Sequence, residues 1–290
     1  MKEILQLQDR LDFLNTQEAC RDSFMEYIRY IWPGFIEGEH HRVIAERLTA
    51  VAKGELKRLI INMPPRHTKS EFASIYFPSW MMGLQPNLKI MQTTHTADLS
   101  INFGRKVRNL MDTEEYTKIF QDVNLAADSK SAGKWQTSKG GEYFAAGVGG
   151  AIAGRGADLL IIDDPHSEQD AMSMNLLDSC YEWYTSGPRQ RLQPGGAIVI
   201  VMTRWSTMDL TGRLLTRQTE LNSDQWEVIE LPAIFEDTEE VLWPEFWQKE
   251  ELESVKASIP VTKWNAQYQQ NPTSEEGAII KRDWWQIWDS

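Results

Sequence analysis

The stretch LIINMPPRHTKSEFAS, residues 59–74, decides the fold class of this chain. It opens with β-branched apolar residues, which predict a buried strand, and it closes with residues that are typical of a helix. Aligned to the phosphate-loop pattern G-x-x-x-x-G-K-[ST], Lys69 and Ser70 occupy the last two positions. Met63 and Thr68 stand where the pattern has glycine, so the letters alone do not match. A Lys-Ser pair without further context is common at the start of a solvated helix.

The place of this pair between a strand and a helix is what favours a phosphate site. Backbone N–H groups converge at the amino end of a helix and bind phosphate oxygens there. Lys69 is expected to bridge the β- and γ-phosphates of a nucleotide, and the Ser70 hydroxyl is expected to bind Mg²⁺. Thr68 is the difficult position, because its Cβ crowds the approach of the phosphates. The predicted nucleotide-contacting residues are Pro65, Arg66, His67, Thr68, Lys69 and Ser70.

A second element is the segment ADLLIIDDP, residues 157–165, in which an apolar run ends in two aspartates. In parallel sheets the carboxyl ends of the strands border the ligand crevice. We expect Asp163 to hold Mg²⁺ through water and Asp164 to orient or deprotonate the attacking water. A strand that ends in an Asx-type turn before Pro165 is the simpler alternative. The strand, Lys-Ser pair and helix found upstream favour the metal site.

Two more segments carry candidate functional residues. GAIVIVMTRW, residues 196–205, predicts a buried strand that places Thr203 beside the γ-phosphate, as a sensor that couples hydrolysis to movement. A threonine at a strand end without such a role is equally consistent with the sequence. GVGGAIAGRGADLL, residues 147–160, is rich in glycine and displays Arg155, which suits an arginine finger that reaches a neighbouring subunit's nucleotide. A long turn with one solvated arginine fits that segment about as well.

The remaining sequence alternates between strand and helix patterns. Residues 1–55 are predicted to be helical, and residues 236–290 to form a small helical subdomain and the start of a linker. Between them, apolar strands alternate with helices, which indicates a mostly parallel sheet covered on both faces. The core is therefore placed at residues 56–235, with strands expected at residues 56–63, 87–94, 141–147, 157–165, 196–205 and 226–235.

Composition limits the function further. The 290 residues suit one large α/β domain with attached subdomains. A net charge of −12 argues against a protein that coats nucleic acid. Two cysteines without metal-ligand spacing, no signal peptide and no apolar run of transmembrane length predict a protein of the reducing cytoplasm without membrane contact. The best local basic cluster is Arg105, Lys106 and Arg108, which is either a DNA contact or an ordinary solvated helix face.

In combination these motifs point to a family. MPPRHTKSEF, AGRGADLLIIDDP and VIVMTRW, in this order and spacing, resemble the large terminase subunit of tailed bacteriophages, a DNA-packaging motor. GEHHRVIAERL upstream resembles the adenine-side motif of that family. WNAQYQQNPTSEEGAIIKRDWW downstream resembles the end of its ATPase region, before the linker to the nuclease.

The resemblance implies a RecA-like, additional-strand P-loop NTPase that uses ATP and Mg²⁺ to translocate double-stranded DNA into a procapsid. It implies a portal protein, a small terminase subunit and further copies of the chain as partners, with a ring that is a pentamer on the procapsid. The place of action it implies is the portal vertex in the host cytoplasm. Because the chain ends within the expected linker, no nuclease activity is expected from it.

The resemblance also implies residue roles. Lys69 and Ser70 match the phosphate-loop pair, Asp163 the metal carboxylate and Asp164 the catalytic acid. Thr203 matches the coupling residue, Arg155 the finger that acts in trans, and His41 the polar residue that contacts adenine. The chain departs from the family at two positions. Thr68 stands where loops of the PPRHGKS type keep glycine, and the catalytic acid is aspartate rather than the commoner glutamate.

Two other functions compete with a packaging ATPase. A nucleotide-binding assembly module, which docks on the portal without efficient hydrolysis, would explain Thr68 and the tryptophan-rich end of the chain. A helicase-type translocase is disfavoured, because no second lobe of alternating strands and helices follows residue 236.

Overall fold

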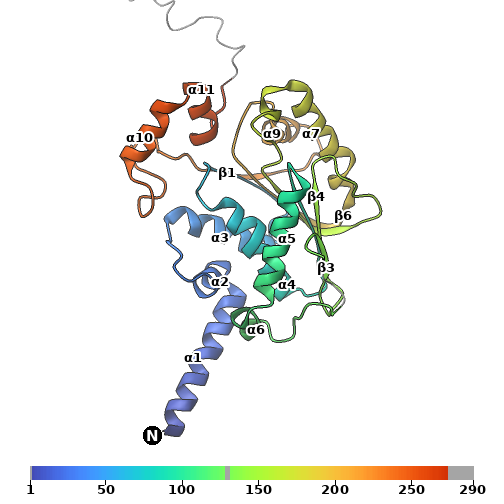
Figure 1. Ribbon diagram of the computed structural model, residues 1–290, viewed down its shortest axis with the longest axis vertical. Helices are drawn as coiled ribbons and strands as arrows, with labels where there is room; N and C mark the ends of the chain where they lie inside the picture. Colours follow the sequence, from blue (N-terminus) through green and yellow to red (C-terminus); the bar gives the residue numbers. More distant parts are fainter. Residues whose placement is uncertain (1, 128–130, 274–290) are drawn as a thin grey trace, which may run out of the picture.

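The computed structural model describes residues 2–127 and 131–273. The chain begins with three helices, α1 (Lys2–Asp22), α2 (Phe24–Ile31) and α3 (Glu39–Ala52), which confirms the helical prediction for this region. Ser23 separates α1 from α2, because its side chain accepts a hydrogen bond from the Glu26 N–H and so caps α2. Figure 1 shows α1 projecting from the body of the molecule, with the amino terminus at its tip.

The centre of the molecule is a sheet that has, within the described residues, the strand order β3-β4-β2-β5-β6-β1-β7. Every neighbouring pair is parallel except β3 and β4. The strands are β1 (Arg58–Asn62), β2 (Lys89–Thr94), β3 (Lys134–Gln136), β4 (Glu142–Gly147), β5 (Ala157–Asp163), β6 (Leu192–Met202) and β7 (Glu227–Glu230). The mostly parallel sheet expected from the sequence is confirmed. β3 was not predicted, because a Lys-Trp-Gln segment carries almost no strand pattern.

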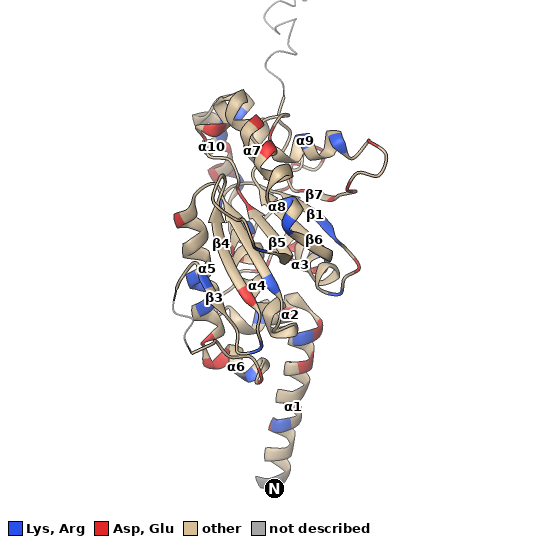
Figure 2. Ribbon diagram, turned by 90° about the vertical axis from the view of Figure 1, so that its right-hand side faces the viewer, with Lys and Arg blue, Asp and Glu red and all other residues tan. Residues whose placement is uncertain are grey.

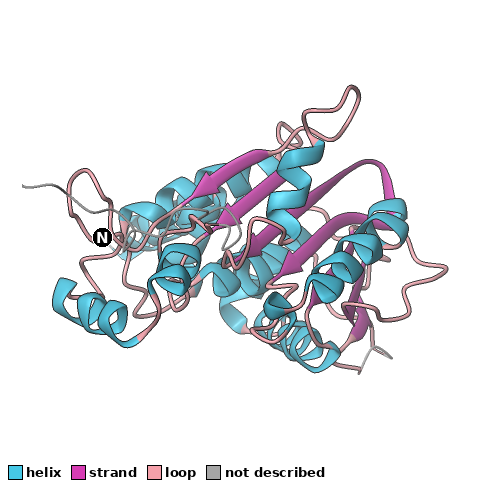
Figure 3. Cartoon of the chain, turned by 90° about the horizontal axis from the view of Figure 1, so that it is seen from above, coloured by secondary structure: helices cyan, strands magenta, loops and turns pink. Residues whose placement is uncertain are grey.

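Helices cover both faces of this sheet. Leu59 and Ile61 of β1 belong to a core shared with α2, α3 and α4, whereas Ile60 between them belongs to a second core shared with α7 and α9. Side chains alternate between the faces of a strand, so a continuous apolar run can serve two cores at once. Figure 3 shows the strands side by side with helices around them. Among the described residues, the α-helices between β1 and β7 are α4 (Phe77–Leu84), α5 (Ala97–Met111), α6 (Glu114–Ile119), α7 (Met174–Ser186), α8 (Pro188–Arg191) and α9 (Leu210–Arg217).

The last described residues pack as a small unit of their own. α10 (Lys249–Ser258), α11 (Val261–Lys263) and a π-helical segment (Trp264–Tyr268) surround a core that contains Ala233, Leu252 and Trp264. The predicted start of a linker falls on residues 274–290, which lie outside the described residues. The domain boundaries predicted at residues 55 and 235 stay predictions. Among the residues that the structure describes, no helix has the length and apolar character to span a bilayer.

Candidate nucleotide-binding site

The predicted site residues meet at one edge of the sheet. β1 pairs with β6 and β6 pairs with β5, all in parallel, so these three strands end at the same edge. The loop that carries Lys69 follows β1, Asp163 is the last residue of β5, and Thr203 directly follows β6. The role predicted for Thr203 required its strand to neighbour the strand of the phosphate loop, and it does. We call this the carboxyl edge of the sheet, and the opposite one the amino edge.

The loop between β1 and the following helix has an unusual backbone. Arg66 and Thr68 adopt φ angles of 64° and 67°. This left-handed region suits glycine, and a β-branched residue such as threonine rarely occupies it. The helix then begins as a π-helical segment (Glu71–Tyr76), a geometry that is often found at functional sites. The loop therefore has the backbone shape that glycine would favour, without the glycine.

Lys69 is buried, and its Nζ lies 3.0 Å from Oδ2 of Asp164. The other carboxylate oxygen of Asp164 accepts a hydrogen bond of 2.8 Å from the Thr203 N–H. The Thr203 hydroxyl donates to the Met63 carbonyl at 3.3 Å, which ties the sensor position back to the loop. Asp164 itself has a φ of 40°. Asp164 thus connects the phosphate-loop lysine to the end of β6.

Asp163 is almost fully buried, with 1% of its surface exposed. Burial, followed by the charge of Asp164, raises the pKa of Asp163 to about 7, although Lys69 and two serines act in the opposite direction. Those serines donate hydrogen bonds to its two oxygens: Ser70 at 3.0 Å and Ser74 at 2.6 Å. Sequence reasoning missed Ser74. The signal for it was its position one helical turn after Ser70, which places both hydroxyls on one face.

The oxygens of Ser70 and Asp163 fit a magnesium ion. Both are hard donors, and they lie 3.0 Å apart beside the place where a phosphate would bind. Within the described residues no group of three or more His, Cys, Asp or Glu side chains could hold a metal ion. Magnesium in phosphate-transfer sites takes one or two protein ligands and completes its shell with phosphate oxygens and water. The donor pair is therefore sufficient for the predicted role.

His41 lies beside the phosphate loop with both ring nitrogens engaged, and the adenine contact predicted for it stays a prediction. Its ring is fully buried, stacks on Phe72 at 4.9 Å between ring centroids, and has both nitrogens engaged. Nδ1 accepts from the Gly38 N–H at 2.8 Å, and Nε2 lies 2.7 Å from the Thr68 hydroxyl oxygen. Burial, then the neighbouring His40, lowers the pKa of His41 to about 2. The structure gives this ring no free polar atom for adenine and connects it to the phosphate loop instead.

Arg155 is also held away from the site of its own chain. Its guanidinium pairs with Glu142 at 2.9 Å and lies 3.8 Å from the centre of the Phe144 ring. Glu142 is the first residue of β4, at the amino edge, whereas Asp163 ends β5 at the carboxyl edge. An action on a neighbouring subunit's nucleotide stays a prediction.

The predicted basic cluster lies on the second half of α5, a helix that starts after β2 at the carboxyl edge and packs on β4. Arg105 and Lys106 are exposed, and the buried Val107 separates them from Arg108. Arg105 donates to the Asn102 side chain at 2.7 Å. Figure 2 shows basic and acidic residues interspersed over this side of the molecule. The structure does not place the cluster beside the nucleotide site, and the DNA contact stays a prediction.

Arg204 is a buried residue that sequence reasoning did not single out. Its guanidinium pairs with Asp209 at 3.0 Å and with Glu230 at 3.3 Å, and its backbone N–H donates to the Gln270 side chain at 3.1 Å. It therefore ties the end of β6 to β7 and to the last described segment. Its position directly after Thr203 was the only signal in the sequence.

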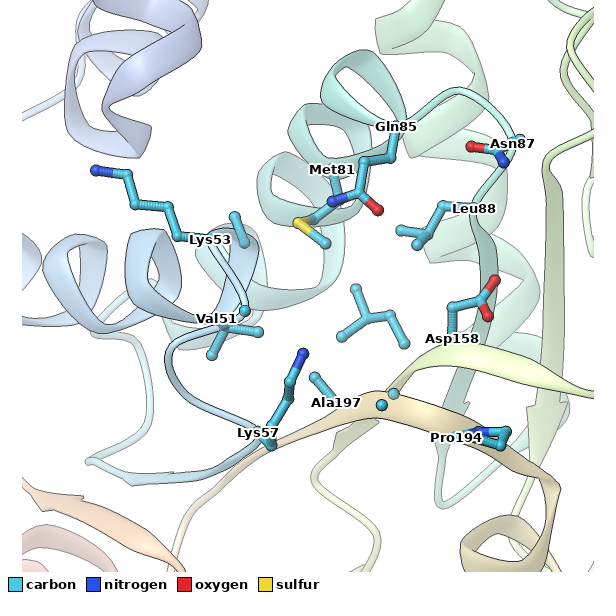
Figure 4. Close-up of a pocket in the computed structure, with 15 residues that line it drawn as sticks. Val51, Lys53, Lys57, Met81, Gln85, Asn87, Leu88, Asp158, Pro194 and Ala197 are labelled. Carbon is cyan, nitrogen blue, oxygen red and sulfur yellow. The ribbon is translucent and has the colours of Figure 1, made fainter.

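A cavity of about 350 Å³ lies at the amino edge of the sheet, among the first residues of β5 and β6 and the turn before β1 (Figure 4). Lys53, Lys57 and Asp158 line it. The cavity is separate from the phosphate loop, since strand beginnings and strand ends lie at opposite edges. It contains none of the residues that the sequence predicted for the site.

Comparison with solved structures shows the fold. The chain is similar to the crystal structure of the HK97 bacteriophage large terminase, with a TM-score of 0.52 and 10% identity over 81% of this chain and 50% of that one. It is also similar to a mutant of the ATPase domain of the Thermus phage P74-26 large terminase, with a TM-score of 0.50 and 13% identity over 78% of this chain and 93% of that one. The chain thus spans half the length of the HK97 protein. No family model and no curated protein matches the sequence. The expected RecA-like P-loop fold is confirmed.

Proposed function

We propose that this chain is the ATPase domain of a viral DNA-packaging motor of the large terminase type. The observation that carries the proposal is the arrangement at the carboxyl edge, where Asp164 contacts both Lys69 and the Thr203 backbone while Ser70 contacts Asp163. These are the parts that phosphoryl transfer needs: a lysine for the phosphates, oxygen ligands for a metal, and a carboxylate for water. The fold shared with two terminases and the order of the motifs support the same reading.

The contacts suggest how these residues act on ATP. The ammonium group of Lys69 has three donors, so it can turn to the β- and γ-phosphates and loosen its contact with Asp164. Asp164 then becomes available to orient the attacking water, while the Thr203 N–H keeps its carboxylate in place. Ser70 and Asp163 would hold Mg²⁺, which neutralises charge on the phosphates. When the γ-phosphate leaves, a movement of Asp164 would be transmitted to the end of β6 through its hydrogen bond with the Thr203 N–H.

The wider assembly belongs to this proposal and rests on the family resemblance. It comprises translocation of double-stranded DNA, docking on a portal protein at the procapsid, a small terminase subunit and a pentameric ring in the host cytoplasm. In that ring Arg155 would leave Glu142 and reach the nucleotide of the next subunit. Arg105, Lys106 and Arg108 would face the DNA from α5.

The test is release of phosphate from ATP by the purified chain, with and without Mg²⁺. We expect Mg²⁺-dependent turnover, and we expect Lys69→Ala to lower it about 100-fold or more because the transferred phosphate loses its cation. Lys57→Ala is the matched control: it removes an exposed lysine at the amino edge and should leave turnover unchanged. Equal turnover in wild type and Lys69→Ala would contradict the proposal.

A second candidate is a nucleotide-binding assembly module without efficient hydrolysis, and Thr68 is the observation that favours it. A β-branched residue at a φ of 67° places a side chain beside the backbone that must bind phosphates. ADP binding that is tight and sensitive to Lys69→Ala, together with no phosphate release above background, would select this candidate.

A further inference from the structure

The phosphate loop of this chain contains a residue that its backbone shape disfavours. Thr68 has a φ of 67°, where a Cβ is in conflict with the adjoining backbone. A threonine persists in such a conformation only when its surroundings fix it there. The residues around Thr68 therefore have to supply what a glycine would supply by its freedom.

The hydroxyl of Thr68 is fixed by two hydrogen bonds. Nδ1 of His41 accepts from the Gly38 N–H at 2.8 Å, so the ring proton resides on Nε2. Nε2 therefore donates to the Thr68 hydroxyl oxygen at 2.7 Å, and that hydroxyl donates in turn to the His67 carbonyl at 2.5 Å. The hydrogen bonds thus run in one direction from Gly38, at the start of α3, to the phosphate loop.

His41 is itself held rigidly. Its ring lies among Phe35, Phe72 and Trp243, with ring centroids 4.8 to 5.0 Å away, and none of its surface is exposed. Trp243 comes from the segment that leads to α10, so the support of the loop includes a residue from the carboxyl-terminal part of the chain. The His40 ring lies nearer still, at 3.8 Å between centroids. A ring packed in this way and hydrogen-bonded at both nitrogens can fix the position of a partner hydroxyl.

We infer that His41 is a positioning residue for nucleotide binding, which acts through Thr68 to hold the phosphate loop in the shape that glycine gives in other loops. The inference rests on the proposed function and deepens it, since it concerns how the same loop is made ready for phosphates. It also accounts for the burial of His41, which an adenine contact does not explain. His41 and Thr68 form one functional pair, in which each residue matters because the other is present.

The test is a double-mutant cycle read as the dissociation constant of a fluorescent ADP with Mg²⁺. We expect His41→Ala to weaken ADP binding about tenfold in the wild-type background, because Thr68 loses the contact that holds it. In the Thr68→Gly background the same substitution should change binding less than about twofold, since glycine needs no support. His41→Gln keeps an N–H donor at this position and should restore part of the affinity.

His40→Ala is the matched control. His40 is buried like His41, stacks on the His41 ring at 3.8 Å between centroids and also contacts Trp243, but it makes no hydrogen bond to Thr68. Its effect on ADP binding should be the same with threonine and with glycine at position 68. Circular dichroism and thermal unfolding of each variant show whether it has folded.

The outcomes separate the inference from the proposed function. An equal loss of affinity on His41→Ala in both backgrounds would show that the ring acts by packing alone and would overturn the inference. If the wild type binds no ADP, the proposed function is overturned. In that case the free energy of unfolding of the same variants is the readout. Coupling between positions 41 and 68 would show that the hydrogen bond holds the loop, and additive effects would overturn the inference.

Discussion

The loops that flank β1, β5 and β6 accommodate positive φ angles differently at the two edges of the sheet. At the carboxyl edge, Arg66, Thr68 and Asp164 have positive φ angles although none of them is glycine. At the amino edge, the turns before β1 and within β6 use Gly54 and Gly195, with φ angles of 78° and 81°. Glycine makes such a turn at little cost, whereas other residues persist there only when neighbours hold them. Strain held by neighbours is typical of functional sites, which agrees with the nucleotide site that we propose at the carboxyl edge.

The two edges also differ in how far their charged side chains are buried. At the carboxyl edge Lys69 and Asp163 are buried, with 8% and 1% of their surfaces exposed, and they depend on their partners. At the amino edge the lysines and Asp158 line an open cavity. Removing charged groups from water costs free energy that pairing offsets only in part. The buried charges at the carboxyl edge therefore lower the stability of the folded chain. Substitutions at the amino edge can therefore serve as controls for substitutions at the carboxyl edge.

The largest difference is expected between two aspartates. Asp164→Asn removes the carboxylate that contacts Lys69 and the Thr203 N–H, and should lower kcat for ATP about 10²–10³-fold. Asp158→Asn at the amino edge keeps a side-chain oxygen that can accept from the Lys89 N–H, and it should leave kcat unchanged. Steady-state ATP turnover measures both. Similar losses at the two positions would contradict the functional distinction between the edges.

The next effect concerns pH, through histidines beside the loop. Burial lowers the pKa of His40 to about 3 and that of His41 to about 2, below the value of 6.5 for an exposed histidine. The unfolded chain therefore binds protons that the folded chain does not, so these groups make stability fall as the pH drops from 7 to 5. Each should cost about 2 kcal/mol over this interval.

The measurement is chemical denaturation at pH 7 and pH 5. The raised pKa of Asp163 gives an opposite trend in the same window, because the folded state then binds the extra proton. Wild type is therefore compared with His40→Asn. The change in the free energy of unfolding between pH 7 and pH 5 should be smaller in this variant by about 2 kcal/mol. An unchanged pH dependence would show that His40 is not held neutral by burial.

A smaller effect is expected from Ser74→Ala. The Ser74 hydroxyl donates to Asp163 at 2.6 Å and accepts from Gln92 at 3.0 Å, so its loss leaves two buried polar groups short of a partner. The free energy of unfolding should fall by about 1.5 kcal/mol. Ser258→Ala on α10, where the hydroxyl is exposed, is the control and should have little effect. A loss no larger than that of the control would mean that Asp163 does not depend on Ser74.

The smallest effect is expected at Gly195. Gly195→Ala places a Cβ at a φ of 81°, where nothing else lies within 4 Å, so only the backbone is strained. The free energy of unfolding should fall by about 1 kcal/mol, with ATP turnover unchanged. A loss of turnover here would remove the contrast between the edges.

The strands and the order of the functional loops could be predicted because they depend on local patterns. The apolar runs that end in Asp163 and Thr203 predict buried parallel strands, and the Lys-Ser pair after β1 indicates the phosphate loop. The placement of His41 could not be predicted, since its hydrogen bond to Thr68 joins residues 27 positions apart through the packing of α3. The orientation of Arg155 toward Glu142 likewise depends on a long loop whose path no local pattern specifies.

The most direct test of the central claim is a crystal structure with a non-hydrolysable ATP analogue and Mg²⁺. We predict that the phosphates lie on the backbone of residues 65–70, with Lys69 turned from Asp164 toward them and Mg²⁺ between Ser70 and Asp163. Thr68 should keep its positive φ and its contact with His41. A nucleotide bound in the amino-edge cavity beside Lys53 and Lys57, or none bound at the carboxyl edge, would contradict the account.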